Sequence, residues 1–226
     1  MNVSTVGSHK TKAEVALQVL RERIRTGELE PGTRLRLKDL TSELGMSPTP
    51  IREALRLLQA DGLVIFRPHQ GILVADRSPQ ELLEIVRLRC LLEPLALELA
   101  VPRLSARELA ELQRLHERLL AALESGRGMA VTKANAAWHW ALYDASGSGY
   151  LTEFIRRLWD ASPWRTMWAL PGRLEQTGRE HDQIMDAILE ADPRLAAERL
   201  RAHIASGTEA LLERLQGSPT AIGPRA

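Results

Sequence analysis

The chain has 226 residues, of which 44% are hydrophobic, so it can bury two modest cores or one large core. The formal net charge is only +1, so the chain is not a polycation that could bind nucleic acid through its overall charge. Any binding to nucleic acid must depend on where the positive charges lie. No run of about 18 apolar residues could span a bilayer and no secretory signal follows Met1, so we expect a cytoplasmic protein with no membrane partner.

The chain begins with a segment that predicts no regular structure. Residues 1–9 show no hydrophobic periodicity, and we expect a disordered tail there. Apolar residues at helical spacing between Ala13 and Ile24 then predict an amphipathic helix that packs on a core and ends at Gly27.

Two short helices joined by a tight turn are predicted next. Leu37, Leu40 and Leu44 mark the first helix, which stops at Gly45. A second helix starts at Ser47-Pro48, because Ser is a good N-cap and Pro has no N–H to leave unpaired. Its apolar residues form one face and its polar residues another: Ile51, Leu55 and Leu58 against Thr49, Arg52, Arg56 and Gln59. The spacing predicts a helix-turn-helix with one packing face and one exposed face.

A β-hairpin should follow this second helix. Residues 63–66 and 71–74 are apolar and β-branched, and a polar segment from Arg67 to Gln70 separates them. The hairpin would form a wing with polar residues at its tip.

At these residues the chain resembles the winged-helix domain of GntR-family transcription regulators. The resemblance is carried by residues 27–35, 44–55 and 62–64 and by Gly71. It implies a DNA-binding domain over residues 10–76, in which Arg52 and Thr49 read base edges in the major groove and Lys38 contacts a phosphate. The full set of expected DNA-binding residues is Lys38, Ser47, Thr49, Arg52, Arg56, His69, Gln70 and Gly71. The family often has Arg where this chain has Pro48, and the alternative of a winged helix used only for protein contacts stays open.

Everything after Arg77-Ser78-Pro79 is predicted to be helical. A long apolar helix from Pro79 breaks at Pro102, and the next begins at Ser105 and ends at Gly126. Further helices are expected over 131–145, over 150–161, from about 173, and over 194–215. We therefore predict a mainly α fold, with an all-helical domain over 77–216 and a disordered tail over 217–226.

Three of the six histidines form a pattern with one asparagine. Asn135 and His139 are four residues apart and lie on one helix face, while His181 and His203 belong to two later helices. Three neutral imidazoles and one oxygen suit a divalent ion such as zinc, nickel or manganese. The alternative is that these are ordinary hydrogen-bonded histidines, and His116, in a charged stretch, is expected at the surface.

This pattern is similar to the FCD effector domain of FadR-like GntR regulators, whose commonest form has Asp at the first position. Asn135 replaces that Asp here, and a neutral amide is a weaker ligand that leaves one more positive charge on the site. The resemblance implies that residues 77–216 form an effector-binding and dimerisation domain. It also implies a metal with open positions that binds the carboxylate of a small organic acid effector. An enzyme with a hydrolytic metal centre is the alternative, although no carboxylate follows a histidine in the His-Glu-x-x-His manner.

Arg89 and the tryptophans are further candidates for effector binding. Arg89 begins an Arg-x-x-Leu-Glu sequence in which the FCD resemblance places the arginine toward the ligand, but an i,i+4 ion pair with Glu93 is equally compatible. All five tryptophans fall between Trp138 and Trp168, as core residues or as walls of a ligand cage. Together, the residues and the resemblance predict a ligand-responsive DNA-binding regulator, a repressor relieved by a small carboxylate effector. It is expected to bind a palindromic operator as a homodimer and not to be an enzyme. The competing hypothesis is a metal-dependent hydrolase-like enzyme fused to a winged helix.

Overall fold

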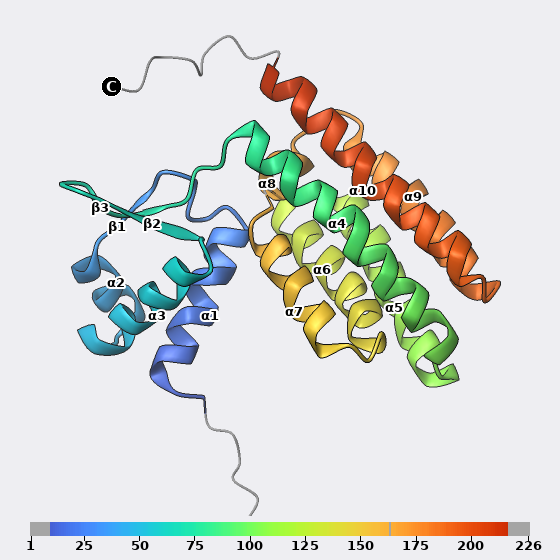
Figure 1. The fold of residues 1–226 in the computed structure, drawn as a ribbon, viewed down its shortest axis with the longest axis horizontal. Coiled ribbons are helices and arrows are strands. Elements are labelled where there is room, and N and C mark those ends of the chain that lie inside the picture. The colour runs from blue at the N-terminus through green and yellow to red at the C-terminus, as the bar shows by residue number, and fades with distance from the viewer. Residues whose placement is uncertain (1–9, 163, 217–226) are drawn as a thin grey trace, which may run out of the picture. The chain divides into compact units, whose positions relative to one another are not determined.

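The computed structural model describes residues 10–162 and 164–216, so the tails predicted at 1–9 and 217–226 lie outside the described residues. The chain divides into two compact units between Asp76 and Arg77 (Figure 1). Helices dominate the described residues and the strands form one small sheet, which confirms the predicted mainly α fold class. Within the described part of the chain, no helix is long and apolar enough to cross a lipid bilayer.

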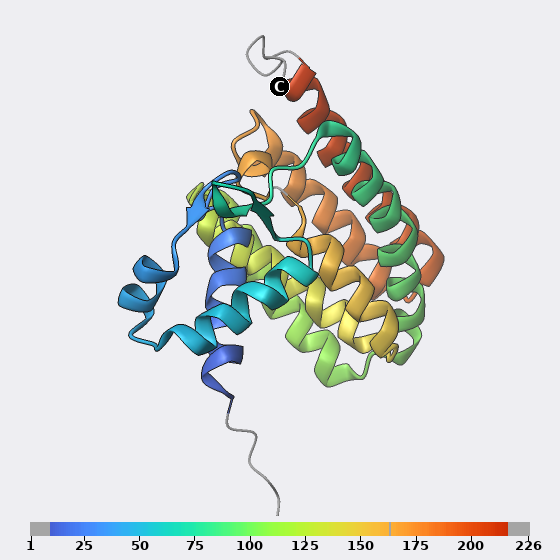
Figure 2. The ribbon, with the colours of Figure 1, turned by 60° about the vertical axis from the view of Figure 1, so that its left-hand side comes forward.

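The N-terminal unit contains three helices and three short strands. In chain order they are α1 (Lys12–Arg25), β1 (Arg34–Leu35), α2 (Leu37–Leu44), α3 (Pro48–Ala60), β2 (Val64–Arg67) and β3 (Gly71–Val74). Helices α1 and α3 cross and pack on each other, as Figure 2 shows. Their apolar faces supply the core of the unit, which includes Leu20, Ile51, Leu55 and Leu58.

The turn between α2 and α3 is as tight as the sequence predicts. Gly45 closes α2 in the left-handed conformation with φ +61°, which a residue without a Cβ adopts at little cost. Ser47 occupies the N-cap position of α3, but its side chain makes no capping hydrogen bond. The helix start therefore depends on Pro48 and on the extended backbone of Ser47 rather than on the predicted Ser cap.

The predicted wing, the hairpin of β2 and β3, belongs to a three-stranded antiparallel sheet in the order β1-β3-β2. Val64 pairs with Val74 across the hairpin, and Arg34 pairs with Leu73 on the other side. Strand β1 was not predicted, because two residues are too short to show an alternating pattern. The hairpin turns at His69, which has φ +63° and lies exposed at the tip.

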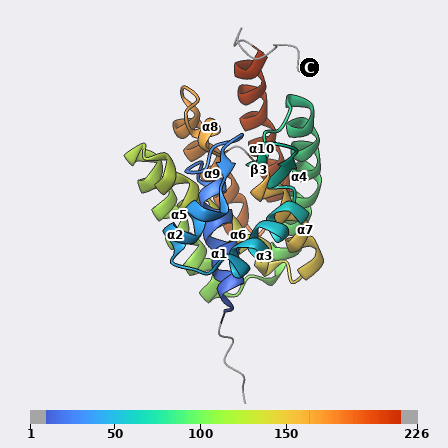
Figure 3. The same cartoon turned by 90° about the vertical axis from the view of Figure 1, so that its left-hand side faces the viewer.

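The C-terminal unit is built from helices alone among its described residues. They are α4 (Pro79–Ala100), the short 3-10 helix η1 (Val101–Arg103), α5 (Ala106–Ser125), α6 (Gly128–Ala145), α7 (Gly149–Asp160), α8 (Trp164–Trp168), α9 (Arg173–Leu189) and α10 (Pro193–Gln216). Helices α4 and α10 lie side by side in both Figure 1 and Figure 3. Helix α6 begins three residues before its predicted start, and α8 was missed because five residues hold too few turns to show a period.

The leucines of α4 separate into two faces. Leu82, Ile85 and Leu97 are buried in the unit. Another set at spacings of 3, 4 and 4 points away from that core: Leu88, Leu91, Leu95 and Leu99, which are 47%, 63%, 44% and 38% exposed. Pro94 lies within α4 without ending it. One helix therefore carries a core face and a second, solvent-exposed apolar face.

Candidate functional sites

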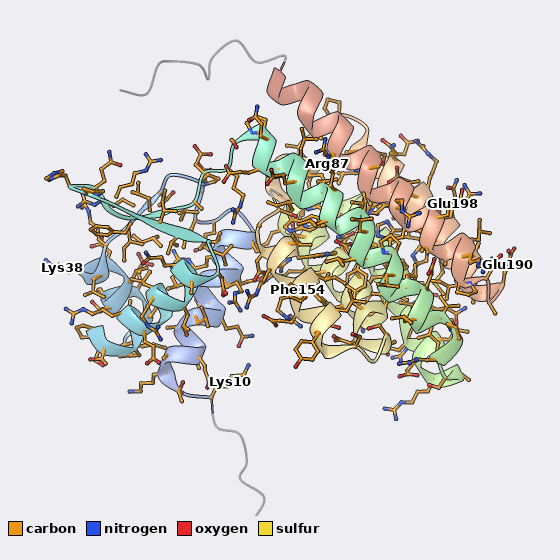
Figure 4. The ribbon with its side chains drawn as sticks, viewed as in Figure 1. Lys10, Lys38, Arg87, Phe154, Glu190 and Glu198 are labelled. Carbon is orange, nitrogen blue, oxygen red and sulfur yellow. The ribbon has the colours of Figure 1, made fainter. Side chains whose placement is uncertain are left out.

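The polar face of α3 is exposed along its length. Thr49, Arg52 and Arg56 are exposed, whereas Ile51 and Leu55 on the opposite face are buried. Lys38 and Ser47 are also exposed, and Figure 4 shows Lys38 at the outer edge of α2. Among the described residues, Lys38, Arg52 and Arg56 have no ion-pair partner, so their charges are available to an external anion.

The wing tip adds polar groups, and strand β1 adds a cation, Arg34, that was not among the residues predicted to bind DNA. His69 and Gln70 are exposed at the tip and Gly71 is half-buried. The guanidinium of Arg34 lies close to Gly71, 3.8 Å from the position a Cβ would take there. Arg34 is thus a candidate phosphate contact beside the wing, and only the pairing of β1 with β3 places it there.

Three buried histidines meet in the C-terminal unit. His139 on α6, His181 on α9 and His203 on α10 each offer one ring nitrogen, and these atoms lie within 4.8 Å of one another. The Nε2 atoms of His139 and His181 are 3.1 Å apart. Nitrogens bound to one ion at about 2.1 Å are roughly 3 to 3.5 Å apart, so this pair already has the required spacing.

The second nitrogen of each ring is held by the protein. His181 Nδ1–H donates to the carbonyl of Thr177 at 2.8 Å, His139 Nδ1 lies 2.9 Å from the Tyr143 hydroxyl, and His203 Nδ1 lies 2.6 Å from Glu180 Oε2. The Tyr143 hydroxyl donates to a carboxylate, so it accepts from His139. The Nε2 lone pairs of His139 and His181 therefore face each other, and a cation between them would turn that repulsion into attraction.

Burial keeps these imidazoles neutral. Burial lowers the pKa of His139 and of His181 well below the usual value, and the neighbouring histidines lower both further. Burial also lowers the pKa of His203, although its hydrogen bond to Glu180 opposes the shift. Neutral imidazole is the form that binds a metal ion.

Asn135 lies one turn before His139 on α6 and is 1% exposed. Its Oδ1 is buried and has no hydrogen-bond partner. A buried amide oxygen without a donor costs free energy that a cation would recover. The donor set of three imidazoles and one amide oxygen thus fits a divalent ion chemically, and the ligand roles of these residues stay a prediction.

Arg89 forms the ion pair with Glu93 that the sequence left open. Arg89 Nε donates to Glu93 Oε1 at 2.6 Å, and the guanidinium lies over the rings of Trp159 and Trp164. Glu93, which is fully buried, also accepts hydrogen bonds from the Trp159 indole and the Tyr143 hydroxyl. Arg89 therefore connects through Glu93 and Tyr143 to His139, and direct contact with an effector stays a prediction.

A second buried ion pair lies beside His203 and was not found from the sequence. Arg173, 2% exposed at the start of α9, lies 3.0 Å from Glu180. Burial raises the pKa of Glu180, but the hydrogen bonds from His203 and Ser206 and the charge of Arg173 hold it at about 2. Gly207 makes room for the guanidinium, because a Cβ there would lie 3.1 Å from Arg173 Nη2. An isolated arginine near a helix start gives no sequence signal for such a role.

The predicted surface position of His116 is wrong. His116 is 9% exposed, lies 2.9 Å from Asp182 Oδ1, and its ring is 6.2 Å from that of Trp138. It falls in register with Leu112 and Leu119 on the buried face of α5, so its helical position overrides the charged residues around it.

Two family models match the chain, one described as "Bacterial regulatory proteins, gntR family" over residues 12–74 and the other as "FCD domain" over residues 84–206. The chain belongs to the GntR family of bacterial regulators. Its FCD domain makes it FadR-like, which confirms the resemblance inferred from the sequence.

Known regulators resemble this chain over most of its length. It is 39% identical over 157 residues to the HTH-type transcriptional regulator McbR of Escherichia coli (strain K12), covering 68% of this chain and 71% of McbR. It is 30% identical over 211 residues to the HTH-type transcriptional repressor GlaR of the same strain, covering 88% and 95%. The solved structure of E. coli McbR/YncC has a TM-score of 0.84 at 29% identity, covering 92% of this chain and 100% of that one. The alternative of a metal-dependent enzyme finds no support, because these families and relatives are transcription regulators.

Proposed function

We propose that this GntR-family protein is a repressor that binds a palindromic operator as a homodimer and responds to a small organic acid. The observation that carries the proposal is the presence in one chain of an exposed, unpaired cationic face on α3 and a buried histidine cluster in the FCD domain. Residues 10–76 are the DNA-binding domain and residues 77–216 the effector-binding and dimerisation domain. Because its partner is genomic DNA, the protein acts in the cytoplasm.

Helix α3 enters the major groove in this proposal. Arg52 forms a bidentate contact with a guanine and Thr49 contacts a thymine methyl, since these pairings match side-chain and base-edge geometry. Lys38 and Arg56 contact phosphates, and the exposed wing tip at His69 and Gln70 reaches the minor groove. Operator affinity should therefore decrease steeply as salt concentration rises.

The metal would be held by Asn135, His139, His181 and His203 and would be zinc, nickel or manganese. Such an ion supplies open coordination positions to a carboxylate. Glu180 and Tyr143 act on the ligands rather than the ion, because they fix the orientation of the His203 and His139 rings. Arg89 is proposed to sense the effector through its buried contacts with Glu93 and the indole rings.

The homodimer would form through the exposed apolar face of α4. Leu88, Leu91 and Leu95 lie on that face, and α7, which packs against α4, carries the exposed Tyr150 and Phe154. Figure 4 shows Phe154 on α7 and Arg87 on α4. A contiguous apolar face on a monomer indicates a partner, and a two-fold dimer presents two α3 helices to the two half-sites of a palindrome.

Two experiments test the proposal. A gel-shift assay with the protein's own promoter DNA, combined with metal analysis and mass spectrometry of the purified protein, tests operator binding and identifies a co-purified acid. Absence of any promoter shift would contradict the regulator, and turnover of ester substrates by the same sample would restore the enzyme hypothesis.

The dimer is tested by Leu91→Glu, which should shift the protein to a monomer in sedimentation at micromolar concentration, because a charge would be buried in the interface. Leu189→Glu is the matched control, since Leu189 is 47% exposed at the end of α9 and should leave the dimer intact. A dimer that survives Leu91→Glu would exclude this face as the interface.

A further inference from the structure

We infer that the effector carries two negative charges, as a dicarboxylate does, because the metal-binding set of this chain brings no negative charge of its own. The inference rests on the proposed function, in which Asn135 and the three histidines hold a divalent cation. It goes further by deriving the charge of the ligand from the charge of the site.

The expected ligands are all neutral. His181 carries its proton on Nδ1, because that atom donates to a carbonyl, and the Tyr143 hydroxyl that faces His139 Nδ1 is itself a donor to Glu93. Asn135 contributes an uncharged amide. Within the described residues, the group that could hold a metal consists of His139, His181 and His203, without a carboxylate or a thiolate. Both positive charges of a bound ion therefore remain uncompensated by its protein ligands.

The two buried ion pairs beside the cluster do not compensate the ion, because each contains one positive and one negative side chain. Arg89 is paired with Glu93 at 2.6 Å, and Arg173 is paired with Glu180 at 3.0 Å. Glu180 reaches His203 through Nδ1, the nitrogen that is turned to the protein. Each acid is matched by one arginine, so the two pairs together add no net charge. A buried, uncompensated divalent ion is strongly unfavourable, and an anion must enter with it.

Trp138 and Thr177 each place a buried donor without an acceptor near the cluster. The Trp138 ring lies 4.9 Å from that of His139 and 4.8 Å from that of His181, and its Nε1–H has no partner. The Thr177 hydroxyl is also unpaired, although the carbonyl of the same residue accepts from His181. The other buried indoles, of Trp159, Trp164 and Trp168, all donate to acceptors in the protein. An anion with several oxygen atoms supplies the missing acceptors and the missing charge together.

Asn135 sets the number of charges that the ligand must bring. An aspartate at this position would provide one negative charge and leave one for the effector, whereas the amide leaves two. Residue 135 is therefore a specificity-determining position as well as a metal ligand. Asn135→Asp should move the preference of the site from dianions toward monoanions.

The test compares acids with amides of the same length on the zinc-loaded full-length protein. The probes are malonate, succinate and glutarate, each measured against its own monoamide by calorimetry, after the zinc content has been determined. The wild type should bind at least one diacid about tenfold or more tightly than its monoamide, a conservative part of the attraction between unit charges about 4 Å apart in a protein. Asn135→Asp should reduce that ratio, and Asn135→Ala, which removes a ligand atom but adds no charge, should retain it.

Three results would overturn the inference: equal binding of diacid and monoamide, binding of neither, or an unchanged ratio in Asn135→Asp. Zinc-free wild type after exposure to zinc would overturn it together with the metal site of the proposed function. Operator binding is measured on the same samples by gel shift, so failure of the regulator proposal is distinguished from failure of the charge argument.

Discussion

The arginines on the polar face of α3 and the arginines beside the histidine cluster lie in opposite environments. Arg52 and Arg56 are exposed and have no ion-pair partner among the described residues, whereas Arg89 and Arg173 are 4% and 2% exposed and are each paired with a glutamate. An exposed cation is stabilised by water and remains available to bind a phosphate, but a buried cation needs a carboxylate of the protein as a permanent partner. The comparison shows that the number of arginines says little about function. The environment of each arginine determines whether its charge is available to a ligand or is used in an ion pair within the protein.

The largest expected effect comes from breaking a buried pair. Glu93→Gln keeps the shape of the side chain but leaves Arg89 buried without a counter-charge, and we expect a loss of about 3 kcal/mol or more in the free energy of unfolding. Chemical denaturation of the full-length variant measures this loss in the free energy of unfolding. The matched control is Glu175→Gln, which breaks the exposed i,i+4 pair with Arg179 and should cost no more than about 0.5 kcal/mol. Equal losses in the two variants would contradict the buried-pair argument.

Replacing a proposed metal ligand should separate the functions of the two units. His181→Ala should lower zinc affinity by more than about 100-fold, since loss even of an outer-shell partner typically costs 10- to 100-fold. The winged helix has its own core, so operator binding should persist while the response to organic acids is lost. Zinc-dependent thermal stability measures the loss of zinc binding, and gel shifts with and without acid measure operator binding and its response. If acid still releases the variant from the operator, the histidine cluster does not sense the acid.

A smaller effect is expected for the proposed base contact of Arg52. Arg52→Ala should weaken discrimination of the operator by about 1 to 3 kcal/mol and leave the fold intact, because Arg52 lies opposite the buried Ile51 and Leu55. Competition gel shifts against unrelated DNA measure the discrimination. Unchanged specificity would show that Arg52 does not face the bases.

The smallest effect is expected for the proposed phosphate contact of Lys38. Lys38→Ala should weaken binding to all DNA sequences about equally and lower the slope of log affinity against log salt by about 1. A salt titration of operator and non-operator DNA measures this slope. A selective loss of operator binding would instead make Lys38 a base-reading residue.

Local patterns in the sequence predict the elements and part of the sites. The winged helix follows from apolar spacing, from Gly45 at the end of α2 and from Pro48 at the start of α3, because each acts within a few residues along the chain. The shared face of Asn135 and His139 follows from helix geometry alone. Family resemblance, rather than spacing, suggested that His181 and His203 join them.

Packing decided everything that depends on distant residues. His139, His181 and His203 approach one another because α6, α9 and α10 pack together, and the same packing determines which ring nitrogen of each is held and which is left over. It also buries His116, pairs Arg173 with Glu180, and separates the α4 leucines into a core face and an exposed face. Periodicity in a sequence specifies which side chains share a helix face. Whether that face is buried, and which residues its side chains pair with, depends on the elements that pack against it, and only the tertiary structure determines those.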